Sequence, residues 1–170
     1  MNRIHSFPPV IDEHARVLVL GTAPSVKSLE YKQFYGHPRN YFWGVVYGLF
    51  NAGAPDPVYE RRLAFLQEHH LAVFDVIESC EREGSLDVNI RDEKPNDLPA
   101  LLAQYPELRC FAFNGSKAYD TFRKNFGDHP AFQSIALLKL PSTSPIPTPK
   151  MRNLENRIEA WSAILPYLNG

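Results

Sequence analysis

Short continuous apolar runs alternate along this chain with segments whose apolar residues recur at helical spacing. Continuous runs of this length are typical of strands that are covered on both faces of a parallel sheet. Four of them predict strands over 16–20, 71–77, 108–113 and 134–140. The helical spacing predicts helices over 42–50, 59–69, 98–105, 116–126 and 154–168.

Strands that alternate with helices favour an α/β fold. We therefore expect a three-layer α/β/α sandwich around a mainly parallel four-stranded sheet. Capping residues sharpen two of the helix starts, since Asp97 precedes one helix and Ser116 is expected to cap another. A chain of 170 residues holds one substantial core, so a single domain is predicted over 1–170.

Two segments lack any regular pattern. The segment 78–95 is charged and shows no clean periodicity, so it is expected to be a loop. The segment 141–149 contains four prolines in nine residues and is expected to be a stiff loop, because proline suits neither a helix interior nor a central strand. Asp75 is an unusual residue inside an apolar run, and it needs a partner if it is buried.

Composition describes an ordinary globular protein, with 44% hydrophobic and 22% charged residues and a net charge of −1. This charge argues against bulk binding of a polyanion, but a local basic rim remains possible. Candidate cations near the expected site loops are Lys27, Lys32, His37, Arg39, Lys139, Lys150 and Arg152.

Cysteine and histidine spacing predicts no metal and no cofactor. Cys80 and Cys110 stand alone, which excludes CxxC-type ligand sets and a four-thiolate iron–sulfur cluster. The first 15 residues lack the apolar core of a signal peptide, and no run approaches the roughly 20 apolar residues of a membrane span. We therefore expect a cytoplasmic protein that does not enter the membrane.

Polar motifs follow the predicted strands. Carboxyl ends of parallel strands meet at one edge of a sheet, where open α/β sheets bind ligands. Gly21, Asn40, Asn114 and the loop that starts at Pro141 all follow or adjoin such ends. We therefore expect them to share one rim, and this expectation carries the functional prediction.

These motifs together resemble the uracil-DNA glycosylase superfamily, and within it the hypoxanthine-DNA glycosylase (DNA-deoxyinosine glycosylase) branch. The matching segments are GTAPS, YGHPRNYFW, DVIESCEREGSLD, FNG and LPSTSP, in that order over nearly the whole chain. The resemblance implies a monofunctional enzyme of base excision repair. It would hydrolyse the N-glycosidic bond of deaminated bases in DNA, chiefly hypoxanthine, as a monomer without a cofactor.

The resemblance assigns catalysis to Asn40 in the HPRN segment. A neutral amide accepts one hydrogen bond from water and donates another, so it can orient a nucleophile without deprotonating it. Other branches place Asp or Asn in the first motif, where this chain has Ala23. That departure moves the catalytic role to Asn40. The alternative is that Asn40 only caps the following helix.

The resemblance places the flipped base against Asn114, Tyr35, Thr22 and Ala23. The amide of Asn114 can pair with the edge that hypoxanthine and uracil share, and Tyr35 offers an aromatic face for stacking. Alternatively, Asn114 and the following glycine form an ordinary turn.

Contacts to DNA are expected from hydroxyls, cations and one apolar wedge. These residues are Ser25, His37, Arg39, Ser142, Thr143, Ser144 and Ile146. A proline-rich surface turn with no ligand is the alternative for the last four.

The segment 78–87 resembles a family segment without an obvious role. Asp75, Ser79, Arg82, Ser85 and Asp87 are expected to support the site loop through hydrogen bonds and ion pairs. A carboxylate pair for acid–base catalysis is the open alternative. Two further functions remain open for the whole chain: a non-catalytic nucleic-acid-binding protein, and a glycosylase whose main substrate is uracil.

Overall fold

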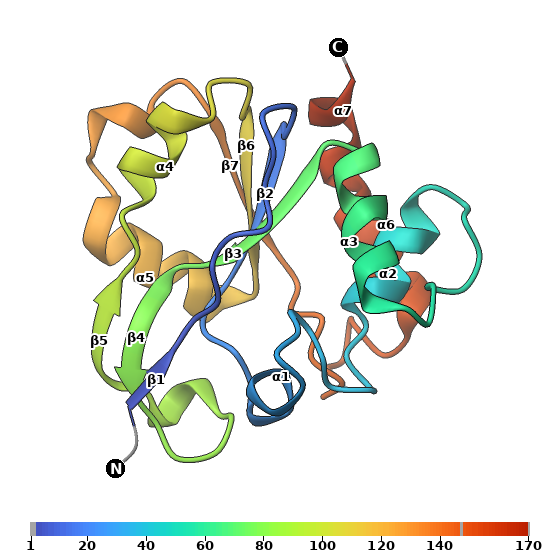
Figure 1. Cartoon of the computed structure of the whole chain (residues 1–170), viewed down its shortest axis with the longest axis horizontal. Helices are drawn as coiled ribbons and strands as arrows, with labels where there is room; N and C mark the ends of the chain where they lie inside the picture. Colours follow the sequence, from blue (N-terminus) through green and yellow to red (C-terminus); the bar gives the residue numbers. More distant parts are fainter. Residues whose placement is uncertain (1–2, 147, 170) are drawn as a thin grey trace.

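A four-stranded parallel sheet forms the centre of the protein. The computed structural model describes residues 3–146 and 148–169 (Figure 1). The sheet contains β2 (Val17–Gly21), β3 (Leu71–Asp75), β6 (Cys110–Asn114) and β7 (Ala136–Leu140), in the order β3-β2-β6-β7. All three pairings are parallel, as the continuous apolar runs predicted.

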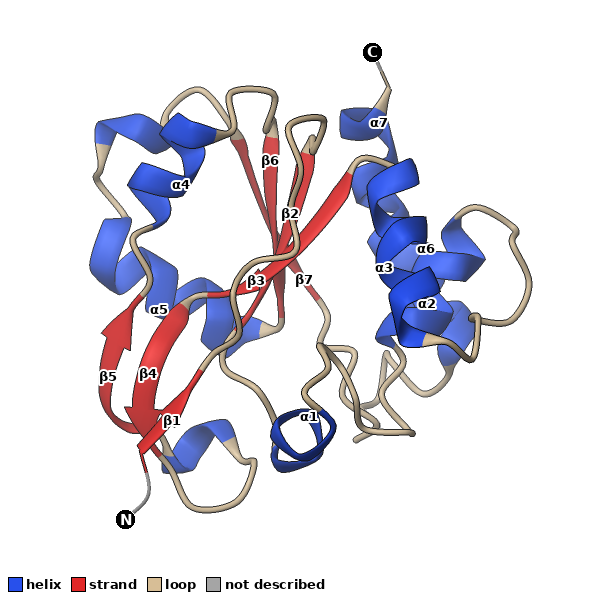
Figure 2. Ribbon diagram, viewed as in Figure 1, coloured by secondary structure: helices blue, strands red, loops and turns tan. Residues whose placement is uncertain are grey.

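Helices cover both faces of this sheet (Figure 2). One layer contains α2 (Phe42–Leu49), α3 (Tyr59–Glu68) and α6 (Leu154–Trp161), and the other contains α4 (Leu98–Gln104) and α5 (Ser116–Phe126). Alternate side chains of β2 enter two separate cores, with Val17 and Val19 in one and Leu18 and Leu20 in the other. The predicted three-layer sandwich is therefore confirmed.

A second sheet corrects the expected loop over 78–95. It is antiparallel and contains β1 (Arg3–His5), β4 (Ile77–Glu81) and β5 (Arg91–Pro95), in the order β1-β4-β5. The sequence of β5, RDEKP, is largely exposed, so it shows no apolar periodicity even though its backbone pairs with β4. The expected strand over 71–77 is likewise two strands, because the chain leaves the parallel sheet after Asp75.

Three helix predictions also need correction. An unpredicted short helix, α1 (Val26–Tyr31), directly follows the GTAPS motif. The expected C-terminal helix is broken into α6, a 3₁₀ turn (Ser162–Ile164) and α7 (Leu165–Leu168). Gly115, with φ of 94°, rather than Ser116, precedes the first turn of α5. Further 3₁₀ turns lie at Asp87–Asn89 and Pro130–Phe132.

The segments with predicted chemistry leave the same end of the parallel sheet. In Figure 1, α1 follows the lower end of β2, and the loop after β7 leaves that same lower end before it reaches α6. Pro147, within the proline-rich segment, lies outside the described residues. Among the described residues, no helix is long and apolar enough to cross a membrane.

Candidate functional site

Thr143 bonds the side chain of Asn114 and the backbone of Tyr41, the residue after Asn40. The Nδ2 of Asn114 donates to Thr143 Oγ1 at 2.9 Å, and the backbone N–H of Thr143 donates to Asn114 Oδ1 at 2.9 Å. The carbonyl of Thr143 accepts a bond of 2.9 Å from the backbone N–H of Tyr41, which is the neighbour of Asn40. The segments that carry the two predicted amides therefore meet at the rim of the sheet.

The amide of Asn114 is already committed within the chain. Its oxygen and its nitrogen each bond Thr143, and the residue is 9% exposed. An amide in this state keeps one lone pair and one N–H for any further partner. Thr143, predicted to contact DNA, is 1% exposed and instead orients Asn114.

Asn40 is half-buried at the start of α2. Its Oδ1 accepts a bond of 2.9 Å from the backbone N–H of Phe42, and its own backbone N–H donates to the carbonyl of His37 at 3.0 Å. The capping contact that sequence reasoning left as an alternative is thus present. It fixes the oxygen of the amide and leaves the two N–H groups of Nδ2 for another acceptor.

Tyr35 lies between Phe42 and the end of β2. Its ring stacks on that of Phe42, with centroids 4.0 Å apart and an interplanar angle of 22°. A Cβ placed on Gly21 would lie 3.1 Å from the Tyr35 hydroxyl and 2.8 Å from Asp75 Oδ1. Both polar groups therefore pack closely against Gly21, where a side chain would collide with them.

Asp75 ends β3 directly beside Gly21 in the sheet register. It is 5% exposed, and desolvation raises the pKa of its carboxyl to about 7, while the charge of Arg82 acts in the opposite direction. Its Oδ2 has no hydrogen-bond partner among the described residues. The position of Asp75 in an apolar run was the sequence signal for this buried carboxyl.

The segment that was hard to assign from sequence supports the first motif. Arg82 is 4% exposed and donates hydrogen bonds to the carbonyls of Gly84 and Pro24. Ser85 Oγ accepts a bond of 2.8 Å from the backbone N–H of Val26, at the start of α1. These contacts agree with the supporting role that we expected for Arg82 and Ser85, whereas Ser79 Oγ accepts hydrogen bonds from Arg3 in β1.

The other residues of the first motif are engaged locally. Thr22 is 7% exposed, and its hydroxyl lies 3.4 Å from Asp87 Oδ2. Ala23 packs on the cluster that contains Ile77 and Cys80. Ser25 caps α1 by accepting a bond of 3.1 Å from the backbone N–H of Ser28.

Arg157 organises the proline-rich loop, and sequence reasoning missed it. It is 1% exposed, and it donates to the carbonyls of Ser142 at 3.2 Å and Ser144 at 3.1 Å. Its guanidinium also lies 4.2 Å from the ring centroid of Tyr41. In the sequence, Arg157 is one charged position of an amphipathic helix, and nothing in that pattern marks it as buried.

The remaining predicted DNA contacts lie at or near the surface. Ser142 and Arg39 are exposed, whereas His37 and Ser144 are half-buried. Ile146 is an exposed apolar side chain at 63% relative exposure, which suits the predicted wedge. Among the described residues, no group of three or more His, Cys, Asp or Glu side chains forms a metal-ligand set.

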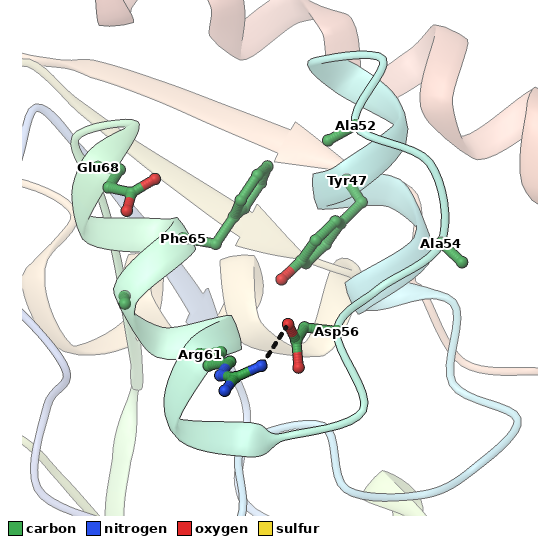
Figure 3. Close-up of a pocket in the computed structure, with 8 residues that line it drawn as sticks. Tyr47, Ala52, Ala54, Asp56, Arg61, Phe65 and Glu68 are labelled. Atoms are coloured by element: carbon green, nitrogen blue, oxygen red, sulfur yellow. Dashed lines mark ion pairs between the residues drawn. The ribbon is translucent and has the colours of Figure 1, made fainter.

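A separate depression of about 420 Å³ lies between α2 and α3 (Figure 3). The stacked rings of Tyr47 and Phe65, 4.0 Å apart, form one part of it, and the ion pair of Arg61 and Asp56 at 3.9 Å forms another. None of the predicted site residues lines it. We take the polar cluster at the sheet rim as the candidate site because the predicted motifs meet there, at the carboxyl ends of the parallel strands.

Comparison with known proteins identifies relatives over nearly the whole chain. The model of the uracil DNA glycosylase superfamily matches residues 8–165. A hypoxanthine DNA glycosylase of Methanosarcina acetivorans is 35% identical over 95% of this chain and 97% of its own length. Its namesake from Methanosarcina barkeri is 37% identical over 92% of this chain and 94% of its own length.

A solved structure supports the same assignment. It is a solution NMR structure of a Methanosarcina acetivorans protein described as a candidate uracil DNA glycosylase. It superposes with a TM-score of 0.78 at 34% identity, and it covers 98% of this chain and 99% of the other. Fold, motif order and sequence similarity agree, and the chain belongs to the uracil DNA glycosylase superfamily.

Proposed function

We propose that this protein is a monofunctional DNA glycosylase that removes hypoxanthine from DNA by hydrolysing the N-glycosidic bond of deoxyinosine. Two relatives named hypoxanthine DNA glycosylase, at 35% and 37% identity over more than nine tenths of the chain, support this activity. The observation that carries the proposal is structural. Thr143 joins Asn114 to the residue after Asn40, so both amides adjoin one rim.

In this proposal the base leaves the duplex before it is cleaved, since its glycosidic bond is inaccessible inside the stack. Phe42 supports one face of the Tyr35 ring, and in this proposal the base stacks on the opposite face. Stacking on an aromatic ring contributes about 1–3 kcal/mol per base. Ile146, at 63% exposure, fills the space that the base vacates.

Asn40 positions the attacking water in this proposal. Its Oδ1 is held by the N–H of Phe42, so the amide plane has a defined orientation. An amide too weak to deprotonate water still steers it toward the sugar carbon, where positive charge develops as the base departs. The sequence has no lysine at position 40 or 114 to form a Schiff base, so the product is an abasic site in an intact strand.

The DNA-binding surface needs only a local positive charge, because the net charge of the chain is −1. Arg157 lies beneath the carbonyls of Ser142 and Ser144, and no carboxylate within the described part of the chain pairs with it. Its charge adds to the potential of the loop above it. We further propose that the enzyme acts as a monomer in the cytoplasm.

A duplex oligonucleotide with one deoxyinosine tests the proposal. Incubation with the protein followed by hot alkali should cleave the strand at the lesion, whereas incubation without alkali should leave it intact. Matched duplexes with uracil, xanthine or adenine at the same position define the base range. An uncut deoxyinosine strand, beside an active control glycosylase, contradicts the proposal. Salt-dependent binding without release of any base then selects the non-catalytic alternative.

A further inference from the structure

Two residues with buried, unpartnered polar atoms lie beside Gly21, and a third such atom belongs to Arg82, whose side chain bonds the carbonyl of Pro24. The three atoms are Asp75 Oδ2, the hydroxyl of Tyr35 and Nη1 of Arg82, and none has a hydrogen-bond partner among the described residues. Tyr35 and Asp75 Oδ1 both face Gly21, while Arg82 is close enough to act on the charge of Asp75. A buried polar group without a partner costs about 1–3 kcal/mol, and native proteins contain few of them. Their presence near one strand end therefore indicates a site for a polar ligand.

The place of these atoms in the fold supports a ligand site. A Cβ at position 21 would lie only 2.8 Å from Asp75 Oδ1 and 3.1 Å from the Tyr35 hydroxyl, so both polar groups can lie this close to the strand end only because residue 21 is glycine. Asp75 and Gly21 are paired neighbours at the carboxyl ends of β3 and β2. That edge is where an open parallel sheet binds its ligand.

Asn114 contrasts with Asp75. Each amide atom of Asn114 already has one bond to Thr143, and the side chain also interacts with the Tyr35 hydroxyl, so Asn114 is at least partly satisfied within the chain. Asp75 is as deeply buried, at 5% exposure against 9%, and its Oδ2 is unpartnered. The residue that still needs a partner is therefore Asp75, although sequence reasoning chose Asn114 as the base reader.

We propose that Asp75 determines base specificity by accepting a hydrogen bond from N1–H of the flipped hypoxanthine, while the Tyr35 hydroxyl donates to O6. This inference rests on the proposed function and names the group that recognises its substrate. Adenine carries a lone pair at N1 and an amino group at C6, so it presents both groups with the wrong polarity. A site built around such a bond rejects the wrong base because its own buried groups stay unpaired.

The protonation state of Asp75 gives this proposal a pH dependence. Burial raises the pKa of its carboxyl to about 7, with Arg82 favouring the ionised form and Asp87 opposing it. Tyr35, which also packs against Gly21, has a raised pKa and stays a neutral donor. The acceptor form of Asp75 gains population as pH rises through 7, so preference for hypoxanthine over adenine should strengthen over the same interval.

Binding of DNA that cannot be cleaved tests this inference separately from the proposed catalysis. The probes are duplexes with 2′-fluoroarabino-inosine, its N1-methyl derivative or 2′-fluoroarabino-adenosine, all of which resist glycosidic cleavage. We expect the wild type to prefer the inosine duplex over both others. Asp75→Ala should lower affinity for that duplex by about 10- to 100-fold, as expected for one hydrogen bond to a charged group, and should bind the N1-methyl duplex almost unchanged. Asp75→Asn keeps an acceptor oxygen, so its affinity for the inosine duplex should lie between those of the wild type and Asp75→Ala.

Two controls test whether a change in base preference comes from lost stability or from lost charge alone. They are the melting temperature of the Asp75 variants and an Asp97→Asn variant. Loss of an unpartnered buried carboxyl should leave the melting temperature unchanged or higher, whereas a purely structural role for Asp75 predicts a lower one. Asp97→Asn removes the same charge from an exposed helix cap and should not change base preference. If Asp75→Ala fails to fold, Asp75→Asn decides the question.

The outcomes are distinct. If the folded Asp75 variants prefer the inosine duplex over the other two as strongly as the wild type does, the inference is overturned. A preference that depends on Asp75, together with failure to cleave ordinary deoxyinosine, overturns the proposed function and supports the inference. Absence of any preference in the wild type overturns the inference, and failure to cleave as well overturns both.

Discussion

Asn114 and Thr143, 29 residues apart in the sequence, share two hydrogen bonds of 2.9 Å in the buried rim of the sheet. One bond uses the threonine hydroxyl and the other its backbone N–H. Because Thr143 also accepts a bond from Tyr41, this pair connects the end of β6 to the loop after β7 and to the start of α2. The relative placement of three sequence motifs depends on this contact.

Thr143→Val should therefore destabilise the fold. Valine matches the shape of threonine but removes the hydroxyl acceptor, which leaves the Nδ2 of Asn114 buried without that partner. We expect a loss of about 1–3 kcal/mol in the free energy of unfolding, measured by urea denaturation. Thr143→Ser keeps the hydroxyl and should lose less. Equal losses for both variants would contradict this role of the hydroxyl.

Asn40→Ala should abolish base release while DNA binding persists. Removal of a group that orients charge or water in a transition state commonly lowers the rate by about 10²–10³-fold. The rate is measured under single-turnover conditions with deoxyinosine duplex. Asn40→Asp retains the oxygen that bonds Phe42 but lacks the amide donor, so it separates capping from catalysis. Full activity in the alanine variant would remove Asn40 from the mechanism.

Arg157→Met should disturb the proline-rich loop and the DNA affinity together. The substitution leaves the carbonyls of Ser142 and Ser144 without their donor and removes the cation beside Tyr41. We expect weaker binding of lesion DNA and a shallower dependence of that binding on salt. Arg16→Met is a matched control, since Arg16 bonds the carbonyl of Leu168 near the C-terminus. A similar effect of both variants on DNA binding would argue against a specific role for Arg157.

Asp75 should make stability fall as pH rises. Its pKa is raised from 3.8 to about 7 on folding, so the folded state binds a proton that the unfolded state has released. The stabilisation from this proton is fully present below about pH 4 and is lost as pH rises through 7. The difference in melting temperature between Asp75→Asn and the wild type should therefore increase from pH 4 to pH 7.5. A constant difference would show that Asp75 titrates normally.

Local patterns in the sequence determined much of this fold. The apolar runs at β2, β3, β6 and β7 predict buried parallel strands, because a strand covered on both faces needs apolar side chains on both. Helical spacing located α2, α3, α4 and α5 within a few residues. The same reasoning failed over 78–95. There β5 is an exposed edge strand that backbone hydrogen bonds hold to β4. Backbone hydrogen bonds do not depend on side-chain polarity, so the sequence pattern does not reveal them.

The sequence also predicted, from motif order and from the rule that parallel strands end at one edge, that these motifs meet at that edge. The sequence did not determine which polar atoms have hydrogen-bond partners within the chain and which do not. Asn114 looked like a free amide and Asp75 like a structural carboxyl, yet Asn114 is bonded twice and Asp75 Oδ2 has no partner among the described residues. Likewise, nothing in the sequence marked Arg157, which is 1% exposed. Only the tertiary structure decided these points, because hydrogen-bond partners and burial come from residues that are distant in the chain.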